Sequence, residues 1–235
     1  MRKRIVVLTG AGISAESGIP TFRDADGLWE GHDVMEVATP QGWAKNPELV
    51  MDFYNQRRKA ALQVKPNTGH LALVDLEKEY DVIVITQNVD NLHERSGSSQ
   101  VIHLHGSLFE SRSTVDESLI YDIEGWELKL GDLCEKGSQL RPNIVWFGEM
   151  VPMMEVAQRE AAQADIFMVV GTSLQVYPAA GLLYDVPAGI PIYIIDPSIP
   201  DYHPQPNITA IAEPASTGVP KLIEQLLNIR WLKSL

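Results

Sequence analysis

The chain has 235 residues and a formal charge of -12, and hydrophobic residues make up 45% of it. That length suits one large domain with or without an insertion, and the hydrophobic content excludes a disordered chain. An acidic surface repels nucleic-acid phosphates, no apolar run approaches the ~20 residues of a membrane helix, and a single cysteine, Cys134, fits a reducing compartment. We therefore expect a cytoplasmic monomer that binds neither nucleic acid nor membranes.

Six short apolar runs rich in Val and Ile recur along the chain. They lie at 5–8, 82–85, 101–104, 144–147, 166–170 and 190–195. Runs of this kind are typical of strands buried on both faces of a parallel sheet. Helices are expected at 153–163, at 219–232 and after Asn67, a residue type that favours helix N-caps. Strands that alternate with helices predict an α/β fold with a doubly wound parallel sheet.

Two regions interrupt this alternation, and we expect them to pack together as a smaller lobe. They cover about 21–65 and 107–140, so the core would consist of 1–20, 66–106 and 141–235. Alternation around Glu124 and Gly125 predicts a short hairpin. The apolar residues expected to hold the second insertion together are Leu119, Ile120, Tyr121, Ile123, Trp126, Leu128 and Leu130.

A glycine-rich turn follows the first predicted strand. Gly10, Gly12 and Ala15 match G-x-G-x-x-G/A, the turn before a helix in Rossmann-like dinucleotide-binding folds. Gly12 would let the backbone approach a pyrophosphate, and the helix N-terminus would stabilise the anion. A turn without a ligand is the alternative. A dehydrogenase would also need an acidic residue that ends a second strand about 20 residues later, and the segment 25–38 has no strand pattern.

His103 and His105 lie two residues apart in a predicted strand, so they face the same side. A metal pair is one alternative, but it would need further ligands that the neighbouring sequence does not supply. Structural, hydrogen-bonded histidines are a second alternative. A general base is the third, because an imidazole with a pKa near neutral suits proton transfer.

Five segments occur in the order GAGISAESGIPTFRDADGLW, TQNVDNLHERSG, HLHGSL, IVWFGEMVP and GTSLQVYPAAG. Together they resemble the sirtuin family, the NAD-dependent protein lysine deacylases. The resemblance implies that NAD is the cofactor and that an acyl group leaves a protein lysine as O-acyl-ADP-ribose, with release of nicotinamide. ADP-ribose transfer to protein is an alternative within the family, and a non-catalytic binder of NAD or ADP-ribose is another.

The resemblance assigns His105 as the general base, Asn88 as the residue that orients groups near the reacting ribose, and Arg23 as part of a loop that covers it. His103 would be structural. Asp196 departs from the Asn of many sirtuins. The implied cofactor-binding residues are Gly10, Ala11, Gly12, Ser14, Thr21, Phe22, Arg23, Gln87, Asn88, Asp90, Gly171, Thr172, Ser173, Asp196 and Ala215.

The partners that the resemblance implies are acyl-lysine peptides, bound as an added strand. Tyr54 and Arg57 share a face of a predicted helix and match the Tyr-x-x-Arg spacing of sirtuins that act on succinyl and malonyl groups. Arg57 would bind the acyl carboxylate and Ala44 would leave room for it; a packed Tyr beside a solvated basic face is the alternative. The peptide contacts would come from Phe147, Gly148, Glu149, Val176 and Tyr177.

Sirtuins usually hold a structural zinc ion with four cysteines in the small lobe. The corresponding window of this chain, 106–142, contains only Cys134. A closed zinc site needs about four ligands. We therefore predict no zinc and no other metal ligand.

Overall fold

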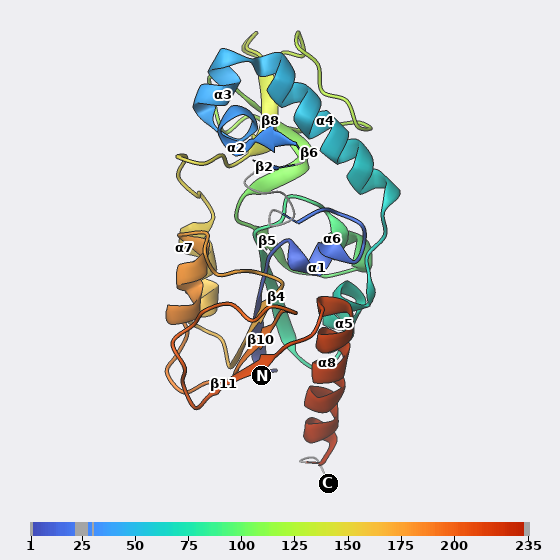
Figure 1. Ribbon diagram of the computed structural model, residues 1–235, viewed down its shortest axis with the longest axis vertical. Helices are drawn as coiled ribbons and strands as arrows, with labels where there is room; N and C mark the ends of the chain where they lie inside the picture. Colours follow the sequence, from blue (N-terminus) through green and yellow to red (C-terminus); the bar gives the residue numbers. More distant parts are fainter. Residues whose placement is uncertain (1, 22–27, 30, 233–235) are drawn as a thin grey trace.

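The computed structural model describes residues 2–21, 28–29 and 31–232. Its larger part is built on a parallel six-stranded sheet with the strand order β11-β10-β9-β1-β4-β5. Figure 1 shows this sheet in the lower part of the molecule, with a second group of helices and strands above it. The strands are β1 (Arg4–Thr9), β4 (Asp81–Thr86), β5 (Val101–His103), β9 (Ile166–Val170), β10 (Ile192–Ile195) and β11 (Ile208–Ile211).

Alternate residues of β1 enter two different cores, because successive side chains of a strand point to opposite faces. Ile5 and Val7 pack with α5 (Thr68–Leu76) and α8 (Ala215–Leu232). Val6 and Leu8 pack with α7 (Met154–Ala161) and the 3-10 helix η1 (Ala179–Tyr184). Helices on both faces confirm the predicted doubly wound, Rossmann-like fold. Strand order reverses at β1, which pairs with β4 on one side and β9 on the other.

The smaller sheet differs from the prediction in two places. Its order is β7-β6-β8 and its pairs are antiparallel; the strands are β6 (Gly106–Ser113), β7 (Ile120–Asp122) and β8 (Leu140–Ile144). The predicted hairpin around Glu124 and Gly125 is wrong, because β7 pairs with β6 instead. The apolar run 144–147 is no strand of the large sheet, because Ile144 ends β8. Trp146 packs with Tyr54 and Leu108 in a core of the smaller part of the molecule, which carries this antiparallel sheet and is called the small body below.

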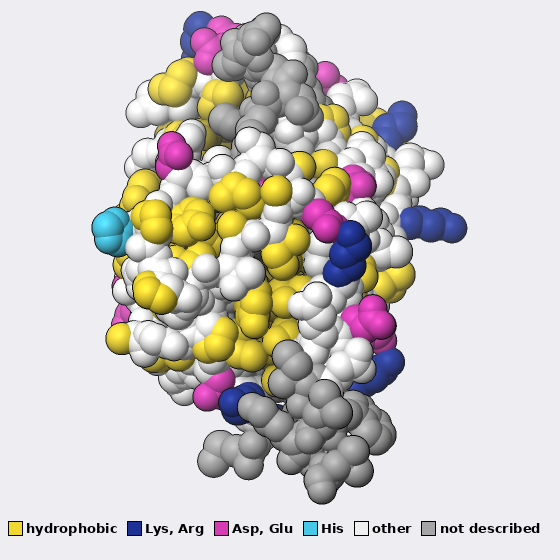
Figure 2. Space-filling view, turned by 60° about the horizontal axis from the view of Figure 1, so that its bottom comes forward, with side chains coloured by type: hydrophobic (Ala, Val, Ile, Leu, Met, Phe, Trp, Pro, Cys, Tyr) yellow, Lys and Arg dark blue, Asp and Glu magenta, His cyan; other side chains and the backbone are white. Residues whose placement is uncertain are grey.

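Five further helices belong to the described part of the chain. In the small body these are α2 (Val34–Val37), α3 (Pro40–Lys45) and the long α4 (Pro47–Gln63), and a short pairing of β2 (Leu28–Trp29) with β3 (His32–Asp33) precedes them. Beside the large sheet, α6 (Leu92–Ser96) follows β4, and α1 is a single turn, Gly12–Ala15. Among the described helices, none is long and apolar enough to cross a membrane. Figure 2 shows acidic side chains scattered over one face rather than gathered in one patch.

Cys134 lies in a small apolar core with Met51, Leu128 and Leu140. Its thiol contacts the Ser113 hydroxyl, with 3.3 Å between Sγ and Oγ. Of the apolar residues predicted to hold this region, Leu128 is buried and Leu119, Tyr121 and Ile123 pack against the core, whereas Ile120 and Leu130 are exposed. In the part of the chain that is described, no three His, Cys, Asp or Glu side chains lie close enough to hold a metal. The absence of zinc stays a prediction.

A buried polar clip ties the same region to α4. Asn55 Nδ2 donates to the Leu128 carbonyl at 2.8 Å, and the Leu128 N–H donates back to Asn55 Oδ1 at 2.9 Å. The fully buried Arg58 donates to the carbonyls of Leu108 and Trp126 and to Asn55 Oδ1. The clip therefore satisfies backbone groups from two segments that are distant in the chain, as buried polar groups require.

Arg58→Met should lower the free energy of unfolding by about 2–4 kcal/mol, because it leaves the buried carbonyls of Leu108 and Trp126 without this donor. Urea unfolding measures the change, and Gln56→Ala, an exposed change on the same helix, is the control.

Excess EDTA should leave the urea-unfolding midpoint of the wild-type protein unchanged. A large EDTA effect would show that a metal, rather than the clip, holds the small body.

Two fully buried histidines pack together under the large sheet's carboxyl edge. The His70 and His93 rings have centroids 4.9 Å apart, and His93 Nε2 lies 3.1 Å from Thr9 Oγ1. His70 also completes the cap of α5, where its Nδ1 accepts from the Asn67 N–H. Burial lowers the pKa of His70 to about 4 and that of His93 well below its ordinary value, so both are neutral in the folded protein at pH 7.

Because the unfolded histidine has a pKa near 6.5, the unfolded chain binds protons more readily than the fold does. The stabilisation is fully present above about pH 6.5 and is lost progressively as the pH falls toward 4. For His70 alone, values of 6.5 and about 4 correspond to roughly 3 kcal/mol. Urea unfolding from pH 7.5 to 4 should show this loss, and His70→Gln, which keeps an acceptor in the cap, should flatten it. Equal slopes for both proteins would contradict the assignment.

Candidate active site

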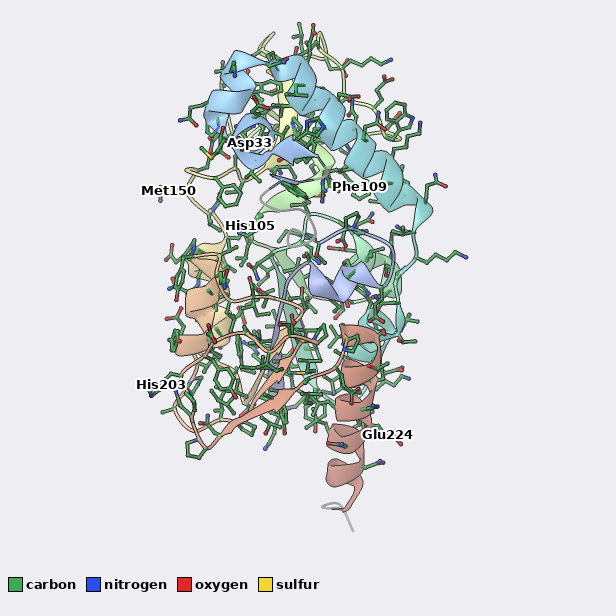
Figure 3. The ribbon with its side chains drawn as sticks, viewed as in Figure 1. Asp33, His105, Phe109, Met150, His203 and Glu224 are labelled. Carbon is green, nitrogen blue, oxygen red and sulfur yellow. The ribbon has the colours of Figure 1, made fainter. Side chains whose placement is uncertain are left out.

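A cavity of about 610 Å³ lies where the strands of the large sheet end and the small body begins. Its walls include Gly10 and Thr172, which follow β1 and β9, and Asp196, which follows β10. Tyr54 and Trp146 line it from the small body. Figure 3 shows His105 between the two bodies. Open α/β sheets bind ligands at this carboxyl edge, where the strand order reverses.

Two glycine-containing loops cross at the floor of the cavity with no room for a side chain. The Gly12 N–H donates to the Gly171 carbonyl at 2.8 Å. A Cβ atom on Gly12 would lie 2.7 Å from Gly171 Cα, and one on Gly10 would lie 2.7 Å from the Gly171 oxygen. Gly12 is thus required by its contact with another loop, a reason that the motif does not reveal. Helix α1 is one turn long, shorter than the motif predicts.

Ser14, Asn88 and Asp90 form one buried hydrogen-bonded group. The Ser14 hydroxyl donates to Asp90 Oδ2 at 3.0 Å and accepts from Asn88 Nδ2 at 3.2 Å. The Leu92 N–H donates to the other Asp90 oxygen at 3.0 Å. Burial raises the pKa of Asp90, and these two hydrogen bonds oppose the rise. All three residues line the cavity, so a carboxylate and a carboxamide are held there in fixed orientations.

His105 lines the cavity, and one of its two ring nitrogens is hydrogen-bonded to the backbone. Its Nδ1 lies 3.0 Å from the Gln87 carbonyl oxygen. A carbonyl only accepts, so Nδ1 carries the proton and Nε2 carries the lone pair. Burial lowers the pKa of His105, which keeps the ring neutral at pH 7. The side chain is therefore arranged to accept a proton at Nε2.

His103 is held by other groups. Its Nε2 lies 2.6 Å from Glu94 Oε1 and its Nδ1 lies 3.0 Å from the Asn88 carbonyl oxygen. Burial works to lower the pKa of His103, but the Glu94 carboxylate outweighs it and raises the pKa. Both ring nitrogens are thus engaged in supporting the segment 88–94, which agrees with the structural role that the resemblance implies.

The predicted cofactor-binding residues divide into three groups. Most line the cavity: Gly10, Ala11, Gly12, Ser14, Thr21, Gln87, Asn88, Asp90, Gly171, Thr172, Ser173 and Asp196. Ala215 is buried at the start of α8 outside the described lining, and its neighbour Pro214 takes that place. Phe22 and Arg23 lie outside the described residues.

Tyr54 and Arg57 lie together at the end of the cavity formed by the small body. Both are buried, so the alternative of a solvated basic face is wrong for Arg57. The Arg57 guanidinium stacks over Trp29, with Cζ 4.2 Å from the ring centroid, and the Tyr54 hydroxyl accepts a 3.1 Å hydrogen bond from Trp146 Nε1. The two side chains present a cation and a hydroxyl to the same space.

Ala44 is not the small residue beside them. It is exposed on α3 and lies outside the described lining, whereas the buried Ala38 lines the cavity. Ala38 is the C-cap residue that follows α2, and its carbonyl accepts from the Phe147 N–H at 3.0 Å. Ala38, Trp29 and Pro214 were missed because each comes from a separate segment, and no local pattern marks them.

The predicted peptide contacts line the outer part of the cavity: Phe147, Gly148, Glu149, Val176 and Tyr177. Phe147 and Tyr177 are exposed there, as is the neighbouring Met150. The Glu149 carboxylate, by contrast, accepts hydrogen bonds from Arg112, from Arg141 and from the Trp146 N–H. The exposed apolar side chains of this rim, rather than that carboxylate, are thus what it offers a peptide.

Comparison with known proteins places this geometry in a family. A model of the Sir2 family matches residues 10–178. An NAD-dependent protein deacylase of Helicobacter pylori is 56% identical over 227 residues, which cover 97% of this chain and 99% of that protein. One of Bacteroides thetaiotaomicron is 54% identical over 230 residues, which cover 96% and 98%.

Solved structures agree with this result. A Sir2 homologue in complex with NAD is 41% identical, with a TM-score of 0.88 and coverage of 97% of this chain and 91% of that one. A Sir2 protein bound to an inhibitor, 2'-O-acetyl-ADP-ribose and a deacetylated peptide is 32% identical, with a TM-score of 0.75 and coverage of 94% and 93%. The chain therefore belongs to the Sir2 family of sirtuin enzymes, as its sequence motifs predict.

Proposed function

We propose that the chain is an NAD-dependent protein lysine deacylase that removes succinyl and malonyl groups, and also acetyl groups, from protein lysines. The observation that carries the deacylase part is the neutral His105, whose Nε2 lone pair lines the same cavity as Asn88, Asp90 and the crossed glycine loops. The relatives named above as NAD-dependent protein deacylases support the same activity.

The cavity's lining fits NAD. The backbone N–H groups of Ala11, Thr172 and Ser173 suit phosphates, Asp196 suits ribose hydroxyls, and Asp90 suits the NH2 of a carboxamide. When bound, NAD would supply an ADP-ribosyl group whose ribose carbon accepts the acyl oxygen as nicotinamide leaves. Asn88 would orient groups beside that ribose. His105 would take a ribose hydroxyl proton at Nε2, while the Gln87 carbonyl holds Nδ1–H and fixes the ring.

Mass spectrometry of acyl-lysine peptides incubated with NAD should detect free lysine, nicotinamide and O-acyl-ADP-ribose. His105→Ala should lower kcat/KM by about 10²–10⁴-fold, the usual contribution of a general base. Because burial lowers the pKa of His105, wild-type kcat/KM should stay level from pH 8 to about 6.5 and fall only at lower pH. ADP-ribosylated protein without peptide deacylation would favour the transferase alternative instead.

The acyl preference rests on Tyr54 and Arg57. Arg is always charged and its planar guanidinium can bind a carboxylate through two parallel hydrogen bonds. The Tyr54 oxygen accepts from the Trp146 indole, so the Tyr54 hydrogen is available to a second acceptor in the cavity. The small side chain of Ala38 leaves room beside them. A succinyl or malonyl chain would place its carboxylate against both donors.

Arg57→Met should lower kcat/KM for a succinyl-lysine peptide by about 10- to 100-fold, the range of a lost charge-assisted hydrogen bond, and change it little for the acetyl form of the same peptide. Lys59→Met removes the same charge from an exposed position of α4 and is the matched control. An equal loss for the two peptides in Arg57→Met would contradict the role of Arg57.

A further inference from the structure

A buried cluster of three charges lies beside the acyl end of the cavity. Glu149 accepts from Arg141 Nη1 at 2.8 Å and Nη2 at 3.0 Å, and from Arg112 Nη2 at 3.1 Å. The side chains of Arg112, Arg141 and Glu149 are 7%, 10% and 17% exposed. Two arginines against one glutamate leave one positive charge in excess. Glu117 reaches Arg112 only at 3.9 Å and is 77% exposed, so solvent screens it.

Trp146 connects this cluster to the cavity. Arg141 Cζ lies 3.4 Å from the centroid of the indole ring, and the described lining includes Trp146 but not Arg141. Arg141 therefore lies behind the indole as seen from the cavity. On the same ring, Nε1 donates to the Tyr54 hydroxyl. A continuous chain of contacts thus runs from Glu149 through Arg141 and Trp146 to Tyr54.

Arg141 contacts Trp146, and the charges of Arg141 and Glu149 also influence the pKa of the neighbouring Tyr54 hydroxyl. Burial is the main influence on the pKa of Tyr54 and raises it. Arg57 and Arg141 act to lower that pKa, and Glu149 acts to raise it. A negative charge at the Tyr54 oxygen is therefore favoured by the two arginines and opposed by the glutamate. An acyl carboxylate beside Tyr54 would feel the same two influences.

We infer that Arg141 and Glu149 are positioning residues that set how strongly the cavity prefers an anionic acyl chain to a neutral one. The positive charge of Arg141, stacked on Trp146, would raise the preference for an anionic acyl chain. The negative charge of Glu149 would lower that preference. The inference rests on the proposed binding of the acyl carboxylate by Tyr54 and Arg57, and it adds two residues whose charged groups bind each other.

The same residues also support the segment that would bind the peptide. Glu149 Oε2 accepts from the Trp146 N–H at 2.8 Å, and the Glu149 N–H donates to the Trp146 carbonyl at 3.0 Å. Arg141 Nη2 donates to the Ile144 carbonyl at 2.8 Å. Loss of this support would affect peptides with any acyl group alike. Only the ratio of activities on two acyl groups separates the effect of charge from the effect of structure.

The experiment compares kcat/KM for succinyl-lysine and acetyl-lysine forms of one peptide in three variants of the full chain. Arg141→Met should lower the succinyl-to-acetyl ratio about fivefold, and Glu149→Gln should raise it about fivefold, because a charge behind the indole acts on the carboxylate from a distance rather than by direct contact. Glu149→Gln keeps an oxygen for the Trp146 N–H. Arg141→Lys keeps the charge without the bidentate geometry, so it should keep the wild-type ratio even where both activities fall.

Ratios within twofold of wild type in both Arg141→Met and Glu149→Gln would overturn the inference, as would a shift of both in the same direction. Such a result would leave the proposed preference for succinyl and malonyl groups intact if Arg57→Met still lowers the succinyl-to-acetyl ratio. If Arg57→Met leaves that ratio unchanged, the proposed binding of the acyl carboxylate by Arg57 is wrong. The inference about Arg141 and Glu149, which rests on it, would then be wrong as well.

Discussion

The active-site edge of this protein depends on one close approach of backbone to backbone. The loop after β1 and the loop after β9 cross at Gly12 and Gly171, where a Cβ atom on either residue would collide with the other loop. The crossing fixes Ser14 relative to Thr172, and Gln87 Nε2 joins them by donating to Thr172 Oγ1 at 3.0 Å. Three loops from three parallel strands thus become one rigid wall, which a site for a dinucleotide requires.

The small body lies opposite these loops, and its residues Tyr54, Arg57 and Trp146 line the end of the cavity proposed to hold the acyl group. The two parts are joined by backbone hydrogen bonds, from the Leu108 N–H to the Val89 carbonyl at 2.8 Å and from the Val145 N–H to the His105 carbonyl at 2.9 Å. His105 lies at this junction, so the proposed base is positioned by both bodies. Chemistry and acyl selection therefore depend on how firmly the small body is held, which the Asn55–Arg58 clip and the Glu149 cluster each support.

The sequence predicted best what lies within a single segment. Buried parallel strands read as uninterrupted apolar runs, so the large sheet could be predicted from the pattern. The cofactor-binding residues were proposed from the resemblance to sirtuins, and many of them lie in the loops that follow these strands. Tyr54 and Arg57 share one turn of α4, and the resemblance to sirtuins that act on acidic acyl groups singled them out. Ala38 could not be found, because it is placed at the cavity by a contact with Phe147, which is distant in the chain. Arg141 is close to Trp146 in the chain, but no local pattern shows that its guanidinium stacks on that indole. The predicted hairpin around Glu124 and Gly125 is wrong because β7 pairs with β6, which precedes it, and not with the segment that follows Gly125.

The central claim is that the cavity recognises the far end of an acidic acyl chain, and a crystal structure with a bound succinyl-lysine peptide tests it most directly. We expect the succinyl carboxylate to lie about 3 Å from the Arg57 guanidinium and from the Tyr54 hydroxyl, the distance of a charge-assisted hydrogen bond. The acylated lysine should enter beside Phe147 and His105. A carboxylate that points to solvent, with Tyr54 and Arg57 contacting only protein, would contradict the account.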